Sequence, residues 1–157
     1  MLVEKYKPKR LVEVVGQKII IQKIIDYVKN WKPGKALLLY GPTGIGKTLM
    51  VEMVAKENKF NLIEISTSDK DVVSYVKEVL LPASKEGSLL NKKLILIDDI
   101  DSFNDRGLIA EMIKMIKESS GPVIMTANDA YESKLKTLRS YCILVRVNRI
   151  PVNFIER

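Results

Sequence analysis

Residues 41–48 form a glycine-rich segment whose residue types and spacing suit the binding of a polyphosphate. The segment Gly41-Pro-Thr-Gly-Ile-Gly46-Lys47-Thr48 matches the pattern G-x-x-x-x-G-K-[ST] at every position. Glycines let phosphate oxygens approach backbone N–H groups, and the positive end of the following helix points at the anion. The pattern predicts that Lys47 reaches the β- and γ-phosphates of a nucleotide and that the Thr48 hydroxyl is a ligand of Mg²⁺. The predicted nucleotide contacts are Gly41, Pro42, Thr43, Gly44, Ile45, Gly46, Lys47, Thr48 and Leu49.

The context of this segment argues against a glycine turn that merely joins a strand to a helix. The preceding run 36–40 is wholly apolar except for its last residue, Tyr40, and fits a central parallel strand. Met50, Val51 and Val54 follow at helical spacing. A buried strand before the glycines and an amphipathic helix after them are what a phosphate-binding loop requires.

Two adjacent carboxylates, Asp98 and Asp99, follow the apolar run 94–97. An acidic residue at the end of such a strand can hold magnesium opposite Thr48, directly or through water, and Asp98 is the predicted metal ligand. Asp99 stands where many phosphate-loop ATPases place the carboxylate that orients the attacking water. The alternative is that the pair only caps a strand end, which the phosphate loop makes less attractive.

A third polar signal, Asn128, comes directly after the next apolar strand, within Thr126-Ala-Asn-Asp129. Its amide could hydrogen-bond the γ-phosphate or the attacking water. From spacing alone, an Asx turn that leads into the next helix explains this asparagine equally well. The sequence leaves these two interpretations open.

Strand and helix patterns alternate along the chain, which predicts an α/β fold with a five-stranded parallel sheet between helical layers. We expect an irregular segment over 1–17, because Pro8 forbids a continuous helix, and a loop marked by Pro82 and Gly87. Strands are predicted at 36–40, 60–65, 94–97, 123–125 and 142–147, and helices over about 20–30, after Gly46, within 68–80, around 108–116 and within 131–138. Since ligands bind beyond the carboxyl ends of parallel strands, Gly41, Asp98 and Asn128 should meet at one edge.

Composition narrows the classes of function. The 157 residues suffice for one domain, and the absence of histidine excludes His-based metal sites and His-dependent triads. Cys142 is alone, so no internal disulfide is possible, and aromatic residues make up only 6%, which disfavours a base-stacking surface. The apolar runs are only as long as strands, so we expect no segment to span a membrane. Charges at Glu4, Lys5 and Lys7 disfavour a signal peptide.

The net charge of +7 is concentrated at the start of the chain. Residues 1–35 hold nine Lys and Arg against three Asp and Glu, whereas the remainder holds 17 against 16. A solvated lysine-rich surface and attraction to polyphosphate or nucleic acid explain this bias equally well. We expect the basic region to lie near the nucleotide.

Over nearly its whole length the chain resembles the large subunit of replication factor C, the sliding-clamp loader of archaea and eukaryotes, which is an AAA+ ATPase. The resemblance rests on Glu4-Lys-Tyr-Lys-Pro8 through Val15-Gly-Gln17, on the Walker A segment 41–48, and on Leu94-Ile-Leu-Ile-Asp-Asp-Ile-Asp101 as Walker B. Further matches are Asp105-Arg-Gly107, the sensor segment 126–129, and Leu138-Arg-Ser-Tyr-Cys142. It implies that Tyr6, Pro8 and Val15 lie against adenine and that Asn128 is the sensor asparagine.

The resemblance also implies a domain organisation and a set of ligands. Residues 1–17 would contact adenine, 18–150 would form the nucleotide-binding core, and 151–157 would begin a helical lid that the chain lacks. The implied cofactors are ATP or ADP and Mg²⁺. The implied partners are small clamp-loader subunits, the sliding clamp and primer–template DNA, with no membrane, in the cytoplasm of an archaeon or the nucleus of a eukaryote.

Three departures from the family pattern matter. Ser140-Tyr141-Cys142 stands where small subunits carry Ser-Arg-Cys, so we expect this chain to receive an arginine finger and to offer none, although Arg139 is one step away. Asp99 replaces a glutamate, and a displacement of about 1 Å can lower a rate about a hundredfold, so we expect slow hydrolysis. Because the sequence ends at Arg157, the isolated chain should bind nucleotide weakly and hydrolyse almost none.

The predicted function is therefore ATP binding and hydrolysis that load a sliding clamp on primed DNA, with catalytic roles for Lys47, Asp99 and Asn128. One alternative is a nucleotide-responsive structural subunit with little hydrolysis, which Asp99 and Tyr141 favour. Another is a different DNA-associated AAA+ ATPase, such as a branch-migration motor or an initiator, which would form rings of like subunits.

Overall fold

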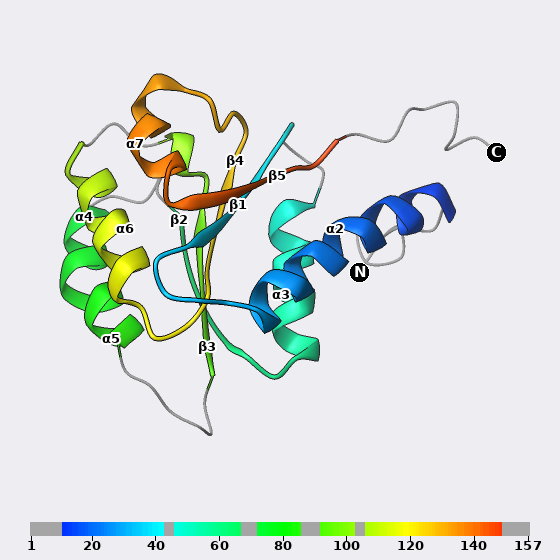
Figure 1. Cartoon of the computed structure of the whole chain (residues 1–157), viewed down its shortest axis with the longest axis horizontal. Helices are drawn as coiled ribbons and strands as arrows, with labels where there is room; N and C mark the ends of the chain where they lie inside the picture. Colours follow the sequence, from blue (N-terminus) through cyan, green and yellow to red (C-terminus); the bar gives the residue numbers. More distant parts are fainter. Residues whose placement is uncertain (1–10, 43–45, 67–71, 86–91, 103–105, 149–157) are drawn as a thin grey trace.

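The centre of the molecule is a five-stranded, wholly parallel sheet with the order β2-β3-β4-β1-β5 (Figure 1). The computed structural model describes residues 11–42, 46–66, 72–85, 92–102 and 106–148, without the side chains of 11–17, 72, 79 and 106. The strands are β1 (Ala36–Tyr40), β2 (Asn61–Ser66), β3 (Lys93–Asp98), β4 (Val123–Ala127) and β5 (Cys142–Arg146). The predicted five-stranded parallel sheet is confirmed.

Helices cover both faces of the sheet, as the alternating pattern predicted. In Figure 1, α2 and α3 lie on one side, and α4 to α7 lie on the other. The helices are α2 (Leu11–Lys29), α3 (Lys47–Glu57), α4 (Val72–Tyr75), the π-helix η1 (Val76–Leu80), α5 (Leu81–Lys85), the 3₁₀ helix η2 (Ile100–Ser102), α6 (Arg106–Glu118), the 3₁₀ helix η3 (Ser133–Leu135) and α7 (Lys136–Arg139). None of the helices in the described part of the chain combines the length and apolar character needed to cross a membrane.

Each face of the sheet carries its own hydrophobic core, because successive side chains of a strand point to opposite faces. Along β1, Ala36 and Leu38 join the core under α4 to α7, whereas Leu37 and Leu39 join the core under α2 and α3. All five residues of β4 are buried. Strands buried on both faces need apolar side chains at every position, which explains the unbroken runs of Leu, Ile and Val.

The strand register brings the carboxyl ends of β1, β3 and β4 to one edge. Tyr40, the last residue of β1, pairs with Ala127, the last residue of β4. On the other side of β4, Ile97 pairs with Met125, so β3 ends at the same level. The loops that follow these three strands therefore share one surface. Gly41, Asp98 and Asn128, which the sequence predicted to meet, lie at this edge.

One helix begins earlier than the sequence predicted. The backbone is already helical from Leu11, whereas an irregular segment was expected up to residue 17. Pro8 excludes helix only around its own position, and Leu11, Val14 and Val15 follow it at helical spacing. A single glycine within a helix costs only about 1 kcal/mol, so Gly16 does not end it.

The loop that Pro82 and Gly87 were predicted to mark does not include Pro82, because this proline lies within α5. The preceding π-helical turn ends with a hydrogen bond from the N–H of Leu81 to the carbonyl of Val76. Proline lacks an N–H group, so it is tolerated where the regular helical bonding pattern is already interrupted. Gly87, the second predicted breaker, lies outside the described residues.

Candidate nucleotide site

The described ends of the phosphate loop have the backbone that the sequence required. At the start of the loop, the N–H of Gly41 donates to the carbonyl of Ala127, which ties the end of β1 to β4 (3.1 Å). At its end, Gly46 adopts a φ of 79°, a left-handed conformation that favours glycine, and α3 begins at the next residue. Since Gly46 has no side chain, none at this position stands between a ligand and the N-terminus of α3.

Lys47 lies inside the curve of the loop that precedes it. Its Nζ donates to the carbonyls of Gly41 (2.8 Å) and Pro42 (3.1 Å), and only 8% of the residue is exposed. Burial lowers the pKa of Lys47, and the carboxylates of Asp99, Asp101 and Asp98 oppose this shift. A buried ammonium needs partners, and the phosphates of a nucleotide would supply additional negative charge in this position.

The two predicted metal ligands lie in direct contact. The Thr48 hydroxyl, in the first turn of α3, donates to Oδ1 of Asp98, the last residue of β3, over 2.7 Å. Both are oxygen donors, which magnesium prefers. No group of three or more acidic, His or Cys residues able to hold a metal occurs in the described part of the chain. A pair of oxygen donors fits an ion whose remaining ligands are phosphate oxygens and water, as those of Mg²⁺ are at nucleotide sites.

Asp99 has an unusual backbone and a perturbed carboxyl group. Its φ is 56°, in the left-handed region that only a few per cent of non-glycine residues adopt, with Asp and Asn enriched among them. Burial raises the pKa of Asp99, the neighbouring carboxylates of Asp98 and Asp101 raise it further, and Lys47 opposes them. The arrangement concentrates negative charge beside the magnesium ligand and the loop lysine.

Two further residues, for which the sequence predicted no role, make hydrogen bonds to the predicted site residues. Thr126, fully buried in β4, donates its hydroxyl to Oδ1 of Asp98 and accepts the N–H of Asp99 (3.0 Å). Asp101, three residues after the metal ligand, accepts the N–H groups of Asn128 (2.9 Å) and Asp129 (3.1 Å) through Oδ2. A hydroxyl in the otherwise apolar strand 123–127 was the one available signal for Thr126.

The sensor segment, residues 126–129, contains an Asx turn, which is formed by Asp129 and not by Asn128. Oδ1 of Asp129 accepts the N–H of Tyr131 over 2.9 Å, which is the hydrogen bond of an Asx turn. Asn128 is exposed immediately after β4, at the same edge as Asp98 and the phosphate loop. Its predicted contact with the γ-phosphate or the attacking water stays a prediction.

Arg139, the alternative arginine finger, is engaged within its own chain. Its guanidinium donates to the carbonyls of Ala130 (2.8 Å) and Glu132 (3.1 Å) and lies 5.1 Å from the centre of the Tyr131 ring. It thus anchors the loop that follows the sensor segment. Cys142 is buried, and burial raises the pKa of its thiol to about 12, which makes it a poor nucleophile.

Several predicted contacts lie outside the described residues. Thr43, Gly44 and Ile45 of the loop are among them, as are Tyr6 and Pro8 of the segment expected to contact adenine. The backbone of Val15 belongs to α2, but its side chain is not described. Leu49 is half-buried in the first turn of α3, next to Thr48.

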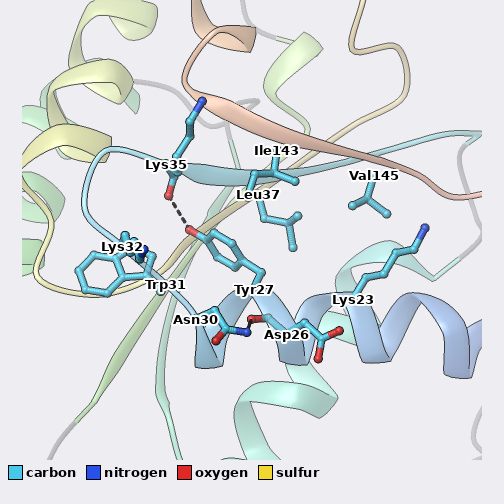
Figure 2. A pocket seen from close by; sticks show the side chains of 10 residues that line it. All are labelled: Lys23, Asp26, Tyr27, Asn30, Trp31, Lys32, Lys35, Leu37, Ile143 and Val145. Carbon is cyan, nitrogen blue, oxygen red and sulfur yellow. Dashed lines mark hydrogen bonds between the residues drawn. The ribbon is translucent and has the colours of Figure 1, made fainter.

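A separate groove of about 490 Å³ lies between the second half of α2 and the strands β1 and β5 (Figure 2). Beneath it, the Tyr27 hydroxyl lies 2.8 Å from the carbonyl of Lys35 and accepts the N–H of Val123 (3.1 Å). The groove is lined by Lys23, Asp26, Tyr27, Asn30, Trp31, Lys32, Lys35, Leu37, Ile143 and Val145. Since none of these residues belongs to the phosphate loop or to the loops after β3 and β4, this groove is not the proposed phosphate site.

The groove shows where part of the basic region lies, whereas its expected place near the nucleotide stays a prediction for residues 1–10, which are outside the described part of the chain. Three lysines of the basic segment 1–35 line the groove. Lys32 and Lys35 lie in the connection from α2 to β1, and Lys23 lies within α2. At least this part of the basic region is therefore not beside the phosphate loop.

Comparisons with known proteins agree with this architecture. The family model described as "ATPase family associated with various cellular activities (AAA)" matches residues 37–149. The chain is similar to proteins named "Replication factor C large subunit", with 41% identity in Nanoarchaeum equitans, 37% in Methanococcus aeolicus and 36% in Thermofilum pendens. These matches cover 93%, 98% and 94% of this chain but 36%, 34% and 38% of the relatives, so the chain spans about a third of their length.

Proposed function

This chain belongs to the AAA family of ATPases, and we propose that it is the nucleotide-binding core of a sliding-clamp loader of the replication factor C type. ATP or ADP would bind with Mg²⁺ between the loop after β1 and the carboxylates after β3. The observation that carries this proposal is the 2.7 Å hydrogen bond between Thr48 and Asp98. It joins the end of a phosphate-loop sequence to an acidic residue 50 positions away.

Each described group has a role in this proposal. The amides at the start of α3 and Lys47 bind the phosphates, and Thr48 and Asp98 hold the cation. Magnesium, when bound, neutralises negative charge on the β- and γ-phosphates. Asp99 and Asn128 orient the attacking water, because both follow strands that end at this edge.

Binding of Mg–ADP to the folded chain tests the site. Calorimetric titration should show saturable binding by the wild type, and Asp98→Asn should weaken it in the presence of Mg²⁺ but not in EDTA. Thr48→Val should behave in the same way, since it removes the other proposed ligand. If well-folded wild-type protein takes up no Mg–ADP, the proposed site is wrong.

The clamp-loading role rests on the resemblance and on the names of the relatives. We propose that small clamp-loader subunits, the sliding clamp and primer–template DNA are the partners of the whole protein. A neighbouring subunit would supply an arginine, an effect of about 10³–10⁵ in rate in related systems. Co-purification of a longer version with candidate small subunits and the clamp tests this, and rings of like subunits on a sizing column would contradict it.

A second candidate is a nucleotide-responsive subunit with little hydrolysis. Three observations favour it: Asp99 carries the shorter carboxylate, Tyr141 replaces an arginine, and Arg139 is bound to its own sensor loop. Steady-state hydrolysis by the assembled complex with clamp and DNA separates the two candidates. Asp99→Glu should raise the turnover if the short carboxylate limits hydrolysis, and an unchanged rate would reject that explanation.

A further inference from the structure

The buried hydroxyl of Thr126 connects the two acidic residues that follow β3. A hydroxyl has one proton and two lone pairs. Here the proton goes to Oδ1 of Asp98, and a lone pair accepts the N–H of Asp99 over 3.0 Å. Thr126 lies on β4, the neighbouring strand, and none of its surface is exposed. Both bonds therefore cross between strands inside the protein.

The bond to Asp98 restricts how its carboxylate can turn. The last torsion of an aspartate is broad, so a carboxylate without fixed partners can rotate. Oδ1 of Asp98 accepts two hydroxyls, one from Thr48 on α3 and one from Thr126 on β4. Two donors on one oxygen fix the plane of the carboxylate, and with it the direction of the remaining lone pairs.

The bond to Asp99 acts on the backbone. Asp99 adopts a φ of 56°, which is disfavoured for a residue with a side chain and persists only where its surroundings impose it. The hydrogen bond from the Asp99 N–H to Thr126 is one such constraint, because it holds the peptide group between Asp98 and Asp99 in place. A change at Thr126 thus reaches the second carboxylate through the main chain.

A hydroxyl at this position is not required for packing. All five residues of β4 are buried, and the other four are Val, Ile, Met and Ala. Valine has nearly the shape of threonine, and a buried hydroxyl without partners is unfavourable. The hydroxyl is therefore accounted for by its two hydrogen bonds at the site.

We propose that Thr126 is a positioning residue of the nucleotide site, which orients Asp98 toward the cation and fixes the backbone of Asp99. This inference rests on the proposed function, because it needs Mg²⁺ and nucleotide as ligands. Groups that orient a metal ligand typically change metal affinity by about 10–100-fold when removed. The effect should appear in the part of nucleotide affinity that depends on magnesium.

The test is calorimetric titration of ADP into the whole chain, with Mg²⁺ and with EDTA. Thr126→Val removes the hydroxyl and keeps the shape, so it should reduce the magnesium-dependent gain in affinity about tenfold or more. Affinity in EDTA should stay within about twofold of the wild type, since the phosphate loop is unchanged. Thr126→Ser keeps the hydroxyl and should retain most of the gain.

A second matched pair keeps the inference testable if the valine variant does not fold. Thr126→Ser and Thr126→Ala both lack the methyl group and differ in the hydroxyl, so the same difference in magnesium dependence is expected between them. If the wild type binds Mg–ADP and the variants without the hydroxyl gain as much ADP affinity from Mg²⁺ as the wild type does, this inference alone is overturned. Equal loss in EDTA and in Mg²⁺ indicates general damage and also overturns it. A folded wild type without Mg–ADP binding overturns the proposed function itself.

Discussion

The carboxyl edge of the sheet and the groove between α2 and β5 show two ways of placing polar residues. At the carboxyl edge, hydrogen bonds link Thr48, Asp98 and Thr126, and a buried lysine lies beside them. At the groove, three lysines lie beside the apolar side chains of Leu37 and Val145, and Trp31 and Ile143 are only partly buried. At the carboxyl edge polar side chains bond to one another, whereas at the groove the side chains of Tyr27, Asn30 and Lys35 bond to backbone carbonyls.

This difference shows why local net charge is a poor guide to the phosphate site. Segment 1–35 holds most of the excess positive charge, yet three of its lysines line the groove. The proposed phosphate site uses a single described lysine, Lys47, among three carboxylates that act on it. Phosphate binding of this kind depends on backbone N–H groups and a helix terminus more than on the number of lysines.

Removing the buried lysine should have the largest effect. Lys47→Ala is expected to weaken Mg–ADP binding about 100-fold or more, because losing one member of a buried charge pair costs about 2–5 kcal/mol. Lys35→Ala, at the groove, is the matched control and should leave binding unchanged. Calorimetry on both variants checks the contrast. Similar losses of Mg–ADP affinity in the two variants would contradict the distinction between the phosphate site and the groove.

The loop after β4 should depend on Asp101. Asp101→Ala removes the acceptor of the Asn128 and Asp129 N–H groups, and hydrogen bonds to charged groups contribute about 1.5–3 kcal/mol. Amide hydrogen exchange at both positions should accelerate about tenfold. Asp129→Ala is the control, because Asp129 accepts only the N–H of Tyr131 among the bonds described here. Unchanged exchange in Asp101→Ala would show that these two hydrogen bonds do not hold the start of the loop after β4.

Much of the fold could be predicted because its causes are local. β1 has the bounds that its apolar run predicted, and the phosphate loop is recognisable within eight residues. That Asp98 meets Thr48 followed from one rule, which is that parallel strands end at a common edge. The start of α2 and the place of Pro82 were predicted wrongly, because single glycines and prolines were treated as absolute breaks.

The connections within the site could not be predicted, because they depend on the register between strands. Thr126 reaches Asp98 only because β3 and β4 pair as Ile97 with Met125. Asp101 reaches the Asn128 amide only through the turn that follows β3. Nothing within a few residues of Thr126 or Asp101 specifies such partners, so a sequence shows the residue types but not these bonds.

The pH dependence of stability should reveal the crowding of carboxylates at the carboxyl edge. Because burial and its neighbours raise the pKa of Asp99, its ionised form is less favourable in the folded chain than in the unfolded chain. Stability is therefore lost as the pH rises from the unfolded pKa through the folded one. Asp99→Asn avoids this loss, so it should unfold at a higher temperature than the wild type at pH 7.

The gain should be below about 1 kcal/mol, or a few degrees, because Asp99 is partly exposed to solvent. Below about pH 4, where an aspartate in the unfolded chain is already protonated, the two proteins should unfold at nearly the same temperature. Thermal unfolding followed by circular dichroism at both pH values measures this. A wild type more stable than Asp99→Asn at pH 7 would show that Asp99 has a stabilising partner that outweighs its acidic neighbours.

The smallest expected effect is at Trp31, the single tryptophan of the chain, which lines the groove. From Leu37, also in the groove, to Gly41 at the phosphate loop, the extended chain spans about 13 Å, and β1 between them is buried on both faces. Binding of Mg–ADP should therefore leave the intensity and wavelength of tryptophan emission unchanged. A shift that saturates with nucleotide, and that Lys47→Ala abolishes, would show instead that the rigid strand transmits occupancy of the site to the groove.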